Sequence, residues 1–303
     1  MNIQETKPNF IIIGAMKSAT TSLYTYLKQH PDIFMTNIKE PMFFNNLNEK
    51  NNFYIKEGMR KRRKIRTFKE YFNLFKNATN QKAIGEASPQ YIYDKECPKL
   101  IKKHLPNTKI IAILRQPIDR AYSNFLHAKR SGKEDIEDFI TAIHEEESRI
   151  KNGWNPLYHY INKGYYFKQL ARYYEVFEKE NIKIILFSEL KKNPINTIKN
   201  VFRFLNVDED FIPNTKHKAN TSGVPKGLLG YIITKLRYYN LMPNIEFSKY
   251  LNKDIINLIY NITYNKPEKI NIAIKKELTN RYYKEDIKHL ENLTNYNLEH
   301  WLN

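Results

Sequence analysis

Residues 10–22 read FIIIGAMKSATTS, and this stretch decides the fold. Its first four residues are apolar and mostly β-branched, which is typical of a buried parallel strand. Gly14 to Ser18 are small or polar and predict a turn. Thr20–Gln29 then predicts a helix with Leu23 and Leu27 on one face. A strand, a loop and a helix N-terminus in this order predict a loop whose backbone N–H groups can bind an anion.

The strand pattern recurs along the chain. Residues 109–114 (KIIAIL) are the clearest buried strand, and residues 82–85 and 182–186 predict two more. Helical patterns lie between them, so we predict an α/β fold: a P-loop-like parallel β-sheet flanked by helices on both faces, with a helical C-terminal region. No Pro/Gly/Ser-rich linker and no internal repeat divides the sequence, so we expect residues 1–303 to form a single domain.

Composition narrows the class of protein. The chain of 303 residues carries 50 Lys and Arg against 32 Asp and Glu, a net charge of +18, which predicts anionic partners. No apolar run approaches the roughly 20 residues of a membrane helix, and no signal-peptide pattern is present. A single cysteine, Cys97, excludes an intramolecular disulfide framework. We therefore expect a cytoplasmic, bacterial protein with no metal site and no integral membrane association.

The loop after the first strand concentrates groups that bind anions. Lys17 adds a positive charge, and the hydroxyl groups of residues 20–22 can donate hydrogen bonds. The loop differs from the ATP-binding P-loop motif because no glycine precedes the lysine. Strand 109–114 also ends in Arg115 rather than in the aspartate that holds magnesium. These differences disfavour an ATPase or GTPase, and an ordinary surface turn is the alternative.

Several segments together resemble a known family. Residues 13–21 (IGAMKSATT) resemble the 5′-phosphosulfate loop of sulfotransferases that use 3′-phosphoadenosine-5′-phosphosulfate (PAPS), and residues 113–123 (ILRQPIDRAYS) resemble their 3′-phosphate motif. Residues 39–44 (KEPMFF), 85–91 (GEASPQY) and the closing stretch 283–301 resemble further elements of the bacterial and carbohydrate branch, which includes the heparan-sulfate type. The resemblance covers nearly the whole chain.

The resemblance implies site residues. We expect Lys17 to stabilise the oxygen that leaves with the nucleotide, and Glu40 to act as general base. The expected donor site consists of Lys17, Ser18, Ala19, Thr20, Thr21, Ser22, Arg115, Ser123, Lys226 and Gly227, and the expected acceptor site of Lys39, Glu40, Ser88, Arg62 and Arg63.

Two histidines are further candidates. We expect His104 to cap the end of a helix, where a positive charge is favoured. His127, on the same predicted helix as Ser123, is an alternative catalytic residue or a packing residue.

The predicted reaction is in-line transfer of a sulfuryl group from PAPS to a hydroxyl or amine of a carbohydrate-type acceptor, a glycan or glycolipid. The product nucleotide is 3′,5′-ADP (PAP), and no metal is required. Arg62 and Arg63 predict a preference for an acidic acceptor. Two alternatives stay open: a P-loop kinase-like phosphotransferase, and a non-enzymatic basic nucleic-acid-binding protein, although no specific nucleic-acid-binding motif is present.

Overall fold

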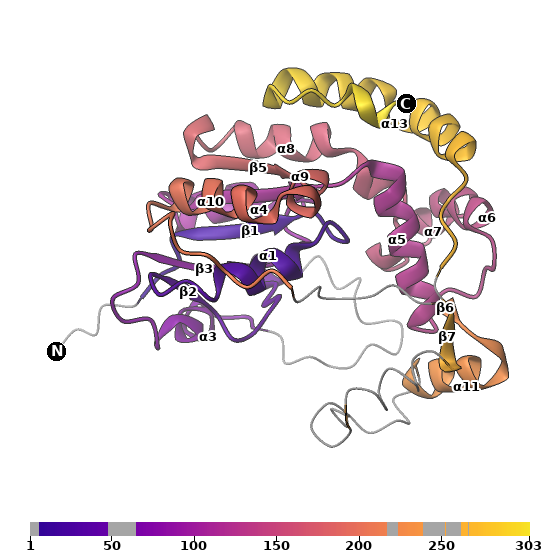
Figure 1. The fold of residues 1–303 in the computed structure, drawn as a ribbon, viewed down its shortest axis with the longest axis horizontal. Coiled ribbons are helices and arrows are strands. Elements are labelled where there is room, and N and C mark those ends of the chain that lie inside the picture. The colour runs from indigo at the N-terminus through magenta and orange to yellow at the C-terminus, as the bar shows by residue number, and fades with distance from the viewer. Residues whose placement is uncertain (1–5, 48–64, 217–223, 239–251, 253–261, 266) are drawn as a thin grey trace.

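A computed structural model describes residues 6–47, 65–216, 224–238, 252, 262–265 and 267–303 (Figure 1). At its centre is a five-stranded sheet in the order β2-β3-β1-β4-β5, and every neighbouring pair is parallel. The predicted fold class is therefore confirmed. The strands are β1 (Phe10–Gly14), β2 (Ile33–Met35), β3 (Ala83–Ala87), β4 (Lys109–Leu114) and β5 (Ile182–Leu186).

Helices cover both faces of this sheet, and two apolar clusters fill the space between the layers. Side chains alternate along a strand, so Ile11 and Ile13 join one cluster while Phe10 and Ile12 join the other. The first cluster packs against α4, α5, α8 and α13, and the second against α1, α9 and α10. The helices and 3-10 turns are α1 (Thr20–Leu27), α2 (Phe43–Leu47), α3 (Phe68–Phe72), η2 (Asn73–Phe75), α4 (Cys97–His104), α5 (Pro117–Arg130), α6 (Phe139–His144), α7 (Glu146–Lys151), η3 (Pro156–Tyr158), η4 (Asn162–Gly164), α8 (Tyr166–Tyr174), η5 (Lys179–Asn181), α9 (Phe187–Lys192), α10 (Pro194–Leu205), α11 (Gly227–Tyr238), α13 (Ile272–Thr294) and η7 (Glu299–Trp301).

Two β elements differ from the sequence prediction. Strand β2 has only three residues, too few for an alternating or apolar run to stand out. The second is an antiparallel ribbon of β6 (Val224–Pro225) and β7 (Tyr264–Asn265), which lies within the region predicted to be helical. Each strand of this ribbon is two residues long and pairs with a strand distant in sequence. The local hydrophobic pattern of the sequence therefore could not reveal the ribbon.

The parallel topology brings four loops to one edge of the sheet. Lys17 follows β1, Glu40 follows β2 by a short segment, Ser88 follows β3 and Arg115 follows β4. Because the carboxyl ends of parallel strands lie at the same edge, residues far apart in sequence converge there. The backbone N–H of Glu40 donates to the carbonyl of Ala87 at 3.1 Å, which ties the loop after β2 to the end of β3.

Gly14 is required where β1 enters its loop. A Cβ atom at this position would lie 2.4 Å from Cγ2 and 2.9 Å from Cβ of Ile92, distances at which one of the two must move. Ile92 is buried, and its backbone N–H donates to the carbonyl of Ile13 at 2.9 Å. The glycine therefore lets the β3–α4 connection pack directly against the start of the anion-binding loop.

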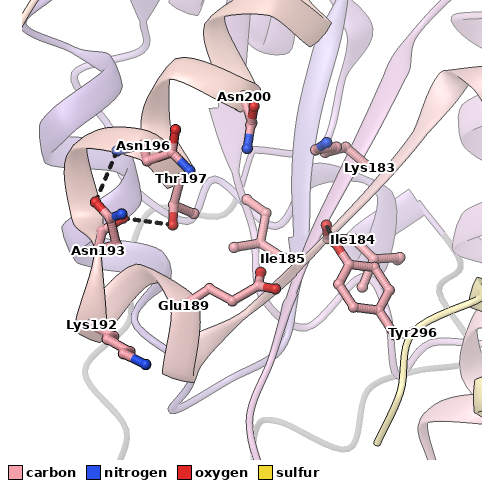
Figure 2. Close-up of a pocket in the computed structure, with 10 residues that line it drawn as sticks. All are labelled: Lys183, Ile184, Ile185, Glu189, Lys192, Asn193, Asn196, Thr197, Asn200 and Tyr296. Atoms are coloured by element: carbon pink, nitrogen blue, oxygen red, sulfur yellow. Dashed lines mark hydrogen bonds between the residues drawn. The ribbon is translucent and has the colours of Figure 1, made fainter.

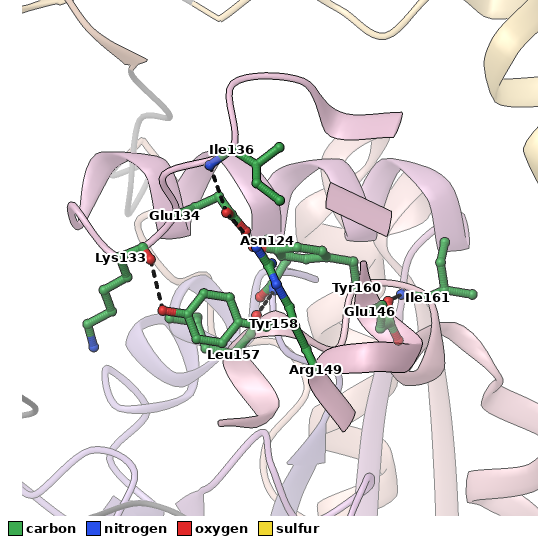
Figure 3. Close-up of polar contacts among 10 residues, drawn as sticks. All are labelled: Asn124, Lys133, Glu134, Ile136, Glu146, Arg149, Leu157, Tyr158, Tyr160 and Ile161. Atoms are coloured by element: carbon green, nitrogen blue, oxygen red, sulfur yellow. Dashed lines mark hydrogen bonds and ion pairs between the residues drawn. The ribbon is translucent and has the colours of Figure 1, made fainter. Parts of the chain in front are cut away.

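A buried ion pair holds the segment between α5 and α8 (Figure 3). The guanidinium of Arg149 donates two hydrogen bonds to the carboxylate of Glu134, at 2.6 and 2.9 Å, and the Tyr160 hydroxyl donates a third at 2.6 Å. Burial alone would raise the pKa of Glu134, but the bonds from Arg149 and Tyr160 hold that pKa below its usual value. This network anchors the turn before η4, whose position matters for the site described below.

Replacing Arg149 by methionine is expected to lower the free energy of unfolding by about 3–5 kcal/mol, because it leaves the Glu134 carboxylate buried without its counter-charge. Urea denaturation measures the change. The matched control is Lys151→Met on the same helix, whose pair with Glu147 is exposed on both sides, so its loss is expected to have a much smaller effect on the free energy of unfolding. Equal losses in the two variants would contradict the structural role given to the buried pair.

Candidate active site

The loop between β1 and α1, which the sequence predicts to bind an anion, has an unusual backbone. Lys17 and Ala19 have φ angles of 69° and 73°, in the left-handed region, and the chain turns sharply into α1. Ala19 occupies the N-cap position, and no side chain of the described residues caps this helix. Its first-turn N–H groups are therefore available to a ligand. Ser18 and Thr20 are buried behind the loop, whereas Thr21 and Ser22 are half-buried.

Lys17 lies in a strongly positive environment. Its pKa is lowered to about 8, and burial is the largest cause, followed by the charges of Arg130 and Arg115. Glu40 acts in the opposite direction, which places its carboxylate within electrostatic reach of the lysine. Lys17 therefore lies among several positive charges, and the carboxylate that offsets them is that of Glu40. Such an arrangement is unfavourable until an anion binds.

Arg115 continues the positive surface from the end of β4. Its guanidinium donates to the carbonyl of Lys17 at 3.3 Å and lies 4.8 Å from the ring centroid of Phe187. Burial lowers its pKa, and no carboxylate forms an ion pair with it among the described residues. The Tyr166 hydroxyl donates to the Arg115 carbonyl at 2.9 Å and fixes the backbone there. Ser123 lies half-buried two turns along α5.

Glu40 lies in a tight turn that its neighbours hold in place. Its φ of 58° and the φ of 53° at Met42 are both left-handed, a region that non-glycine residues seldom adopt. The Met42 N–H donates to the Ser88 hydroxyl at 3.0 Å, and the Lys39 ammonium lies 2.6 Å from the Glu40 carboxylate. Glu40 keeps about a third of its side chain exposed, so an acceptor can reach it.

Ser88 connects this turn to a second carboxylate, Glu86. Ser88 is fully buried, and its hydroxyl donates to Glu86 Oε2 at 2.7 Å, while the Tyr91 hydroxyl donates to Oε1 at 2.8 Å. The pKa of Glu86 is raised to about 7: burial is the largest cause, nearby Glu40 also raises it, and the hydrogen bonds partly offset the increase. Sequence reasoning did not single out Glu86, because a glutamate in a short strand carries no distinguishing signal. Ser88 therefore links the buried Glu86 carboxylate to the backbone of the turn that contains Glu40.

The two histidines occupy different environments. His127 is brought near Lys17: burial, followed by the charges of Lys17 and Arg130, lowers its pKa to about 3, so the imidazole is neutral at physiological pH. His104 is the last residue of α4, and its ring centroid lies 4.4 Å from that of Phe68. The described contacts of His104 do not involve either anion-binding loop.

The remaining predicted residues lie away from this group or outside the described chain. Lys226 is exposed, and its N–H donates to the Thr263 carbonyl at 2.8 Å beside the β6–β7 ribbon. Gly227 begins α11 with a φ of 57°. The ribbon packs against α5, the helix that carries Ser123, but no described hydrogen bond joins Lys226 to Ser123. Arg62 and Arg63 fall outside the described residues.

A surface cavity of about 480 Å³ lies elsewhere, at the outer edge of β5 (Figure 2). It is lined from β5, α9 and α10, and by Tyr296, and contains none of the predicted site residues. Within the described ranges, no group of three or more His, Cys, Asp or Glu side chains is placed to hold a metal ion. In the same ranges no helix has the length and apolar character needed to cross a membrane.

Known proteins share both sequence and fold with this chain. The chain is 36% identical to the membrane-associated sulfotransferase kil1 of Dictyostelium discoideum over 149 residues, 48% of this chain and 29% of that protein. It is 29% identical to mouse bifunctional heparan sulfate N-deacetylase/N-sulfotransferase 4 over 206 residues, 66% of this chain and 22% of that protein. The chain therefore matches less than a third of the length of these two relatives.

A solved bacterial structure matches over almost the whole chain. The sulfotransferase from Alicyclobacillus acidocaldarius superposes with a TM-score of 0.73 and 28% sequence identity, and covers 98% of this chain and 100% of its own. A family model described as the sulfotransferase domain matches residues 7–222, which include the loops after β1, β2, β3 and β4. With both anion-binding loops inside that match, the chain belongs to the sulfotransferase family of enzymes.

Proposed function

We propose that the protein transfers the sulfuryl group of PAPS to a hydroxyl or amine of a carbohydrate acceptor. The observation that carries the proposal is the pair of half-buried cations, Lys17 and Arg115, beside the uncapped start of α1, where the Arg115 guanidinium donates to the Lys17 backbone carbonyl at 3.3 Å. Two half-buried cations, with no described carboxylate in an ion pair with Arg115, fit a ligand with two anionic ends. Lys17 and the N-terminus of α1 suit the 5′-phosphosulfate, and Arg115 with Ser123 suits the 3′-phosphate.

Two side chains of the protein would take up the acceptor's proton and stabilise the negative charge that forms on the leaving nucleotide. The donor supplies the sulfuryl group, whose bond to the 5′-phosphate oxygen breaks as a bond to the acceptor oxygen or nitrogen forms. Glu40 takes the proton that the acceptor loses, and Lys17 stabilises the negative charge left on the 3′,5′-ADP oxygen. The Lys39 ammonium, 2.6 Å from Glu40, orients the carboxylate. Ser88 and Glu86 hold the backbone of the Glu40 turn beneath it.

A glycan acceptor is the part of the proposal supported by the relatives. One of them is named for heparan sulfate, an acidic glycan. The net charge of +18 favours an acidic glycan or glycolipid, and we retain Arg62 and Arg63 as predicted acceptor contacts.

Thermal denaturation with nucleotides tests the donor site. We expect 3′,5′-ADP without metal to stabilise the protein by about 2.7 kcal/mol at 100 times its Kd. A matching concentration of 5′-ADP is expected to give a smaller shift because it lacks the 3′-phosphate. Stabilisation only by ATP with Mg²⁺ would favour the kinase-like alternative. Steeply salt-dependent binding of DNA or RNA with no nucleotide response would favour a basic binding protein.

Arg115 is expected to carry the selectivity for the 3′-phosphate. In Arg115→Met, the affinity for 3′,5′-ADP should fall by about 10–100-fold, as for loss of a charge-assisted contact to a desolvated anion. The affinity for 5′-ADP should change much less. Calorimetric titration of both nucleotides measures the ratio. If both affinities fell equally, Arg115 would be supporting the Lys17 loop rather than binding the 3′-phosphate.

A further inference from the structure

Lys163 is a buried lysine next to the anion-binding loop. It lies in η4 with 3% of its surface exposed, although lysine is rarely buried without a partner of opposite charge. Its ammonium lies 3.6 Å from the thioether sulfur of Met16 and 5.6 Å from the ring centroid of Tyr93. Within the described chain no carboxylate forms an ion pair with it. A thioether and an aromatic face are weak partners for a cation.

The charges that surround Lys163 do not neutralise it. Arg120, from α5, is fully buried and donates to the Tyr160 carbonyl, so a second cation lies close by. Glu146, from α7, is the nearby carboxylate, but it accepts the N–H groups of Ile161 and Asn162 at 2.5 and 2.8 Å. Two buried cations thus share one carboxylate that already binds the backbone.

These surroundings weaken the proton affinity of Lys163. Burial is the largest cause that lowers its pKa, Arg120 also lowers it, Glu146 partly offsets them, and the resulting pKa is about 7. His159 and His127 also lie within electrostatic reach, but burial lowers their pKa values to about 4 and 3, so both are neutral between pH 6 and 9. A protein gains nothing in stability from a lone buried cation, so its position calls for a ligand that balances it.

The segment that carries Lys163 contacts both halves of the proposed donor site. Lys163 meets Met16, the residue before Lys17, and Tyr166, three residues after Lys163, donates to the carbonyl of Arg115 at 2.9 Å. The segment itself is fixed by close packing, because a Cβ atom on Gly164 would lie 2.4 Å from the Tyr283 hydroxyl. Lys163 is therefore held rigidly beneath the loop.

We propose that Lys163 is a positioning residue of the donor site, a buried cation that supports the Met16–Lys17 segment and whose charge is balanced when the anionic donor binds. This inference rests on the proposed function. In the unliganded protein the charge destabilises the fold, and in the complex it attracts the phosphosulfate through a region of low dielectric. The charge of Lys163 therefore lowers the stability of the unliganded protein and raises its affinity for the donor.

Lys163→Met tests the proposal, because methionine has similar length and suits an apolar contact with Met16. We expect its unliganded melting temperature to equal or exceed that of the wild type, and its affinity for 3′,5′-ADP to fall by about tenfold. Lys163→Gln is the second variant, in case the first folds poorly. The matched control is Lys168→Met, which removes the same charge from an exposed lysine that contacts the Tyr165 ring, and should bind 3′,5′-ADP as the wild type does.

The pH dependence gives a readout that a purely structural role would not change. Anion binding raises the pKa of Lys163, so the wild type should take up protons on binding, and its affinity should decline as pH rises through 7. In Lys163→Met the decline should begin only near pH 8, where Lys17 titrates. Glu86 titrates near pH 7 in every variant, so its contribution cancels between them.

The outcomes separate the two proposals. Equal affinity and an equal pH profile in wild type and Lys163→Met would overturn the role of Lys163 while leaving the donor site intact. A lower melting temperature with an unchanged pH profile would make Lys163 a packing residue and also overturn it. Failure of the wild type and of Lys168→Met to bind 3′,5′-ADP would overturn the proposed function, and this inference with it.

Discussion

Replacing Lys17 by methionine is expected to lower kcat for sulfuryl transfer by about 10²–10³-fold, the loss typical of removing one group that stabilises developing charge. Lys17 is placed for this role by the left-handed turn after β1 and by Arg115, which donates to its carbonyl. The measurement is the release of 3′,5′-ADP from PAPS in the presence of a desulfated heparan-type glycan. KM for PAPS should rise less than kcat falls, because the α1 N-terminus and Arg115 remain.

The control for this experiment is Lys28→Met, which removes a lysine from the end of the same α1 segment. Lys28 is exposed, and its ammonium donates to the Asn37 side chain at 2.9 Å. Its loss should leave kcat unchanged. A Lys17→Met enzyme with normal kcat and a raised KM alone would assign Lys17 to ground-state binding instead of to the transition state.

Glu40→Gln is expected to lower kcat by about 10²–10⁴-fold, because the amide cannot accept the proton of the acceptor. Glutamine keeps the shape of the side chain and the backbone bond to Ala87, so the turn should persist. Titration with 3′,5′-ADP should give the affinity of the wild type, since Glu40 does not face the nucleotide product in the proposed reaction. Assay of 3′,5′-ADP release under saturating PAPS measures kcat.

Glu180→Gln is a suitable control, because Glu180 is exposed in η5 on the amino-terminal side of β5, away from the loop edge. It should retain full activity. If Glu40→Gln lost nucleotide affinity in proportion to kcat, Glu40 would be a structural support of the Lys17 loop. Another group would then have to be the base.

The local hydrophobic pattern of the sequence was sufficient to predict most strands of the central sheet. Residues 109–114 and 182–186 are β4 and β5 with the predicted bounds, because buried parallel strands appear as continuous apolar runs. The predicted helix from residue 20 is confirmed as α1, although it ends at Leu27. β2 and the β6–β7 ribbon were missed, since two or three residues cannot display a period.

Only the site residues that directly follow a strand could be predicted from the sequence. Lys17 and Arg115 were expected to share a sheet edge, and the structure joins them by a hydrogen bond. Met16 and Glu86 lie in quoted motifs but were given no role, and Lys163 lies in none, because the environments of all three are formed by contacts between residues distant in sequence. Ser88 was expected to face an acceptor, whereas its hydroxyl is buried against Glu86 and the Met42 N–H. The roles of Lys17, Glu40, Arg115 and Ser123 in catalysis and donor binding stay predictions until the variants above are measured.

The direct contact between Arg115 and the Lys17 carbonyl has a consequence for ligand length. The Arg115 guanidinium donates to the Lys17 carbonyl, and the Tyr166 hydroxyl donates to the Arg115 carbonyl, so these bonds restrict the separation of the two loops. In the proposed donor complex the two loops hold the two anionic ends of the nucleotide at a restricted spacing, so the second contact would form at a high effective concentration once the first is made. Sulfate and phosphate supplied as separate ions gain no such chelate advantage. An isomer with its phosphate at the 2′ position should lose most of it.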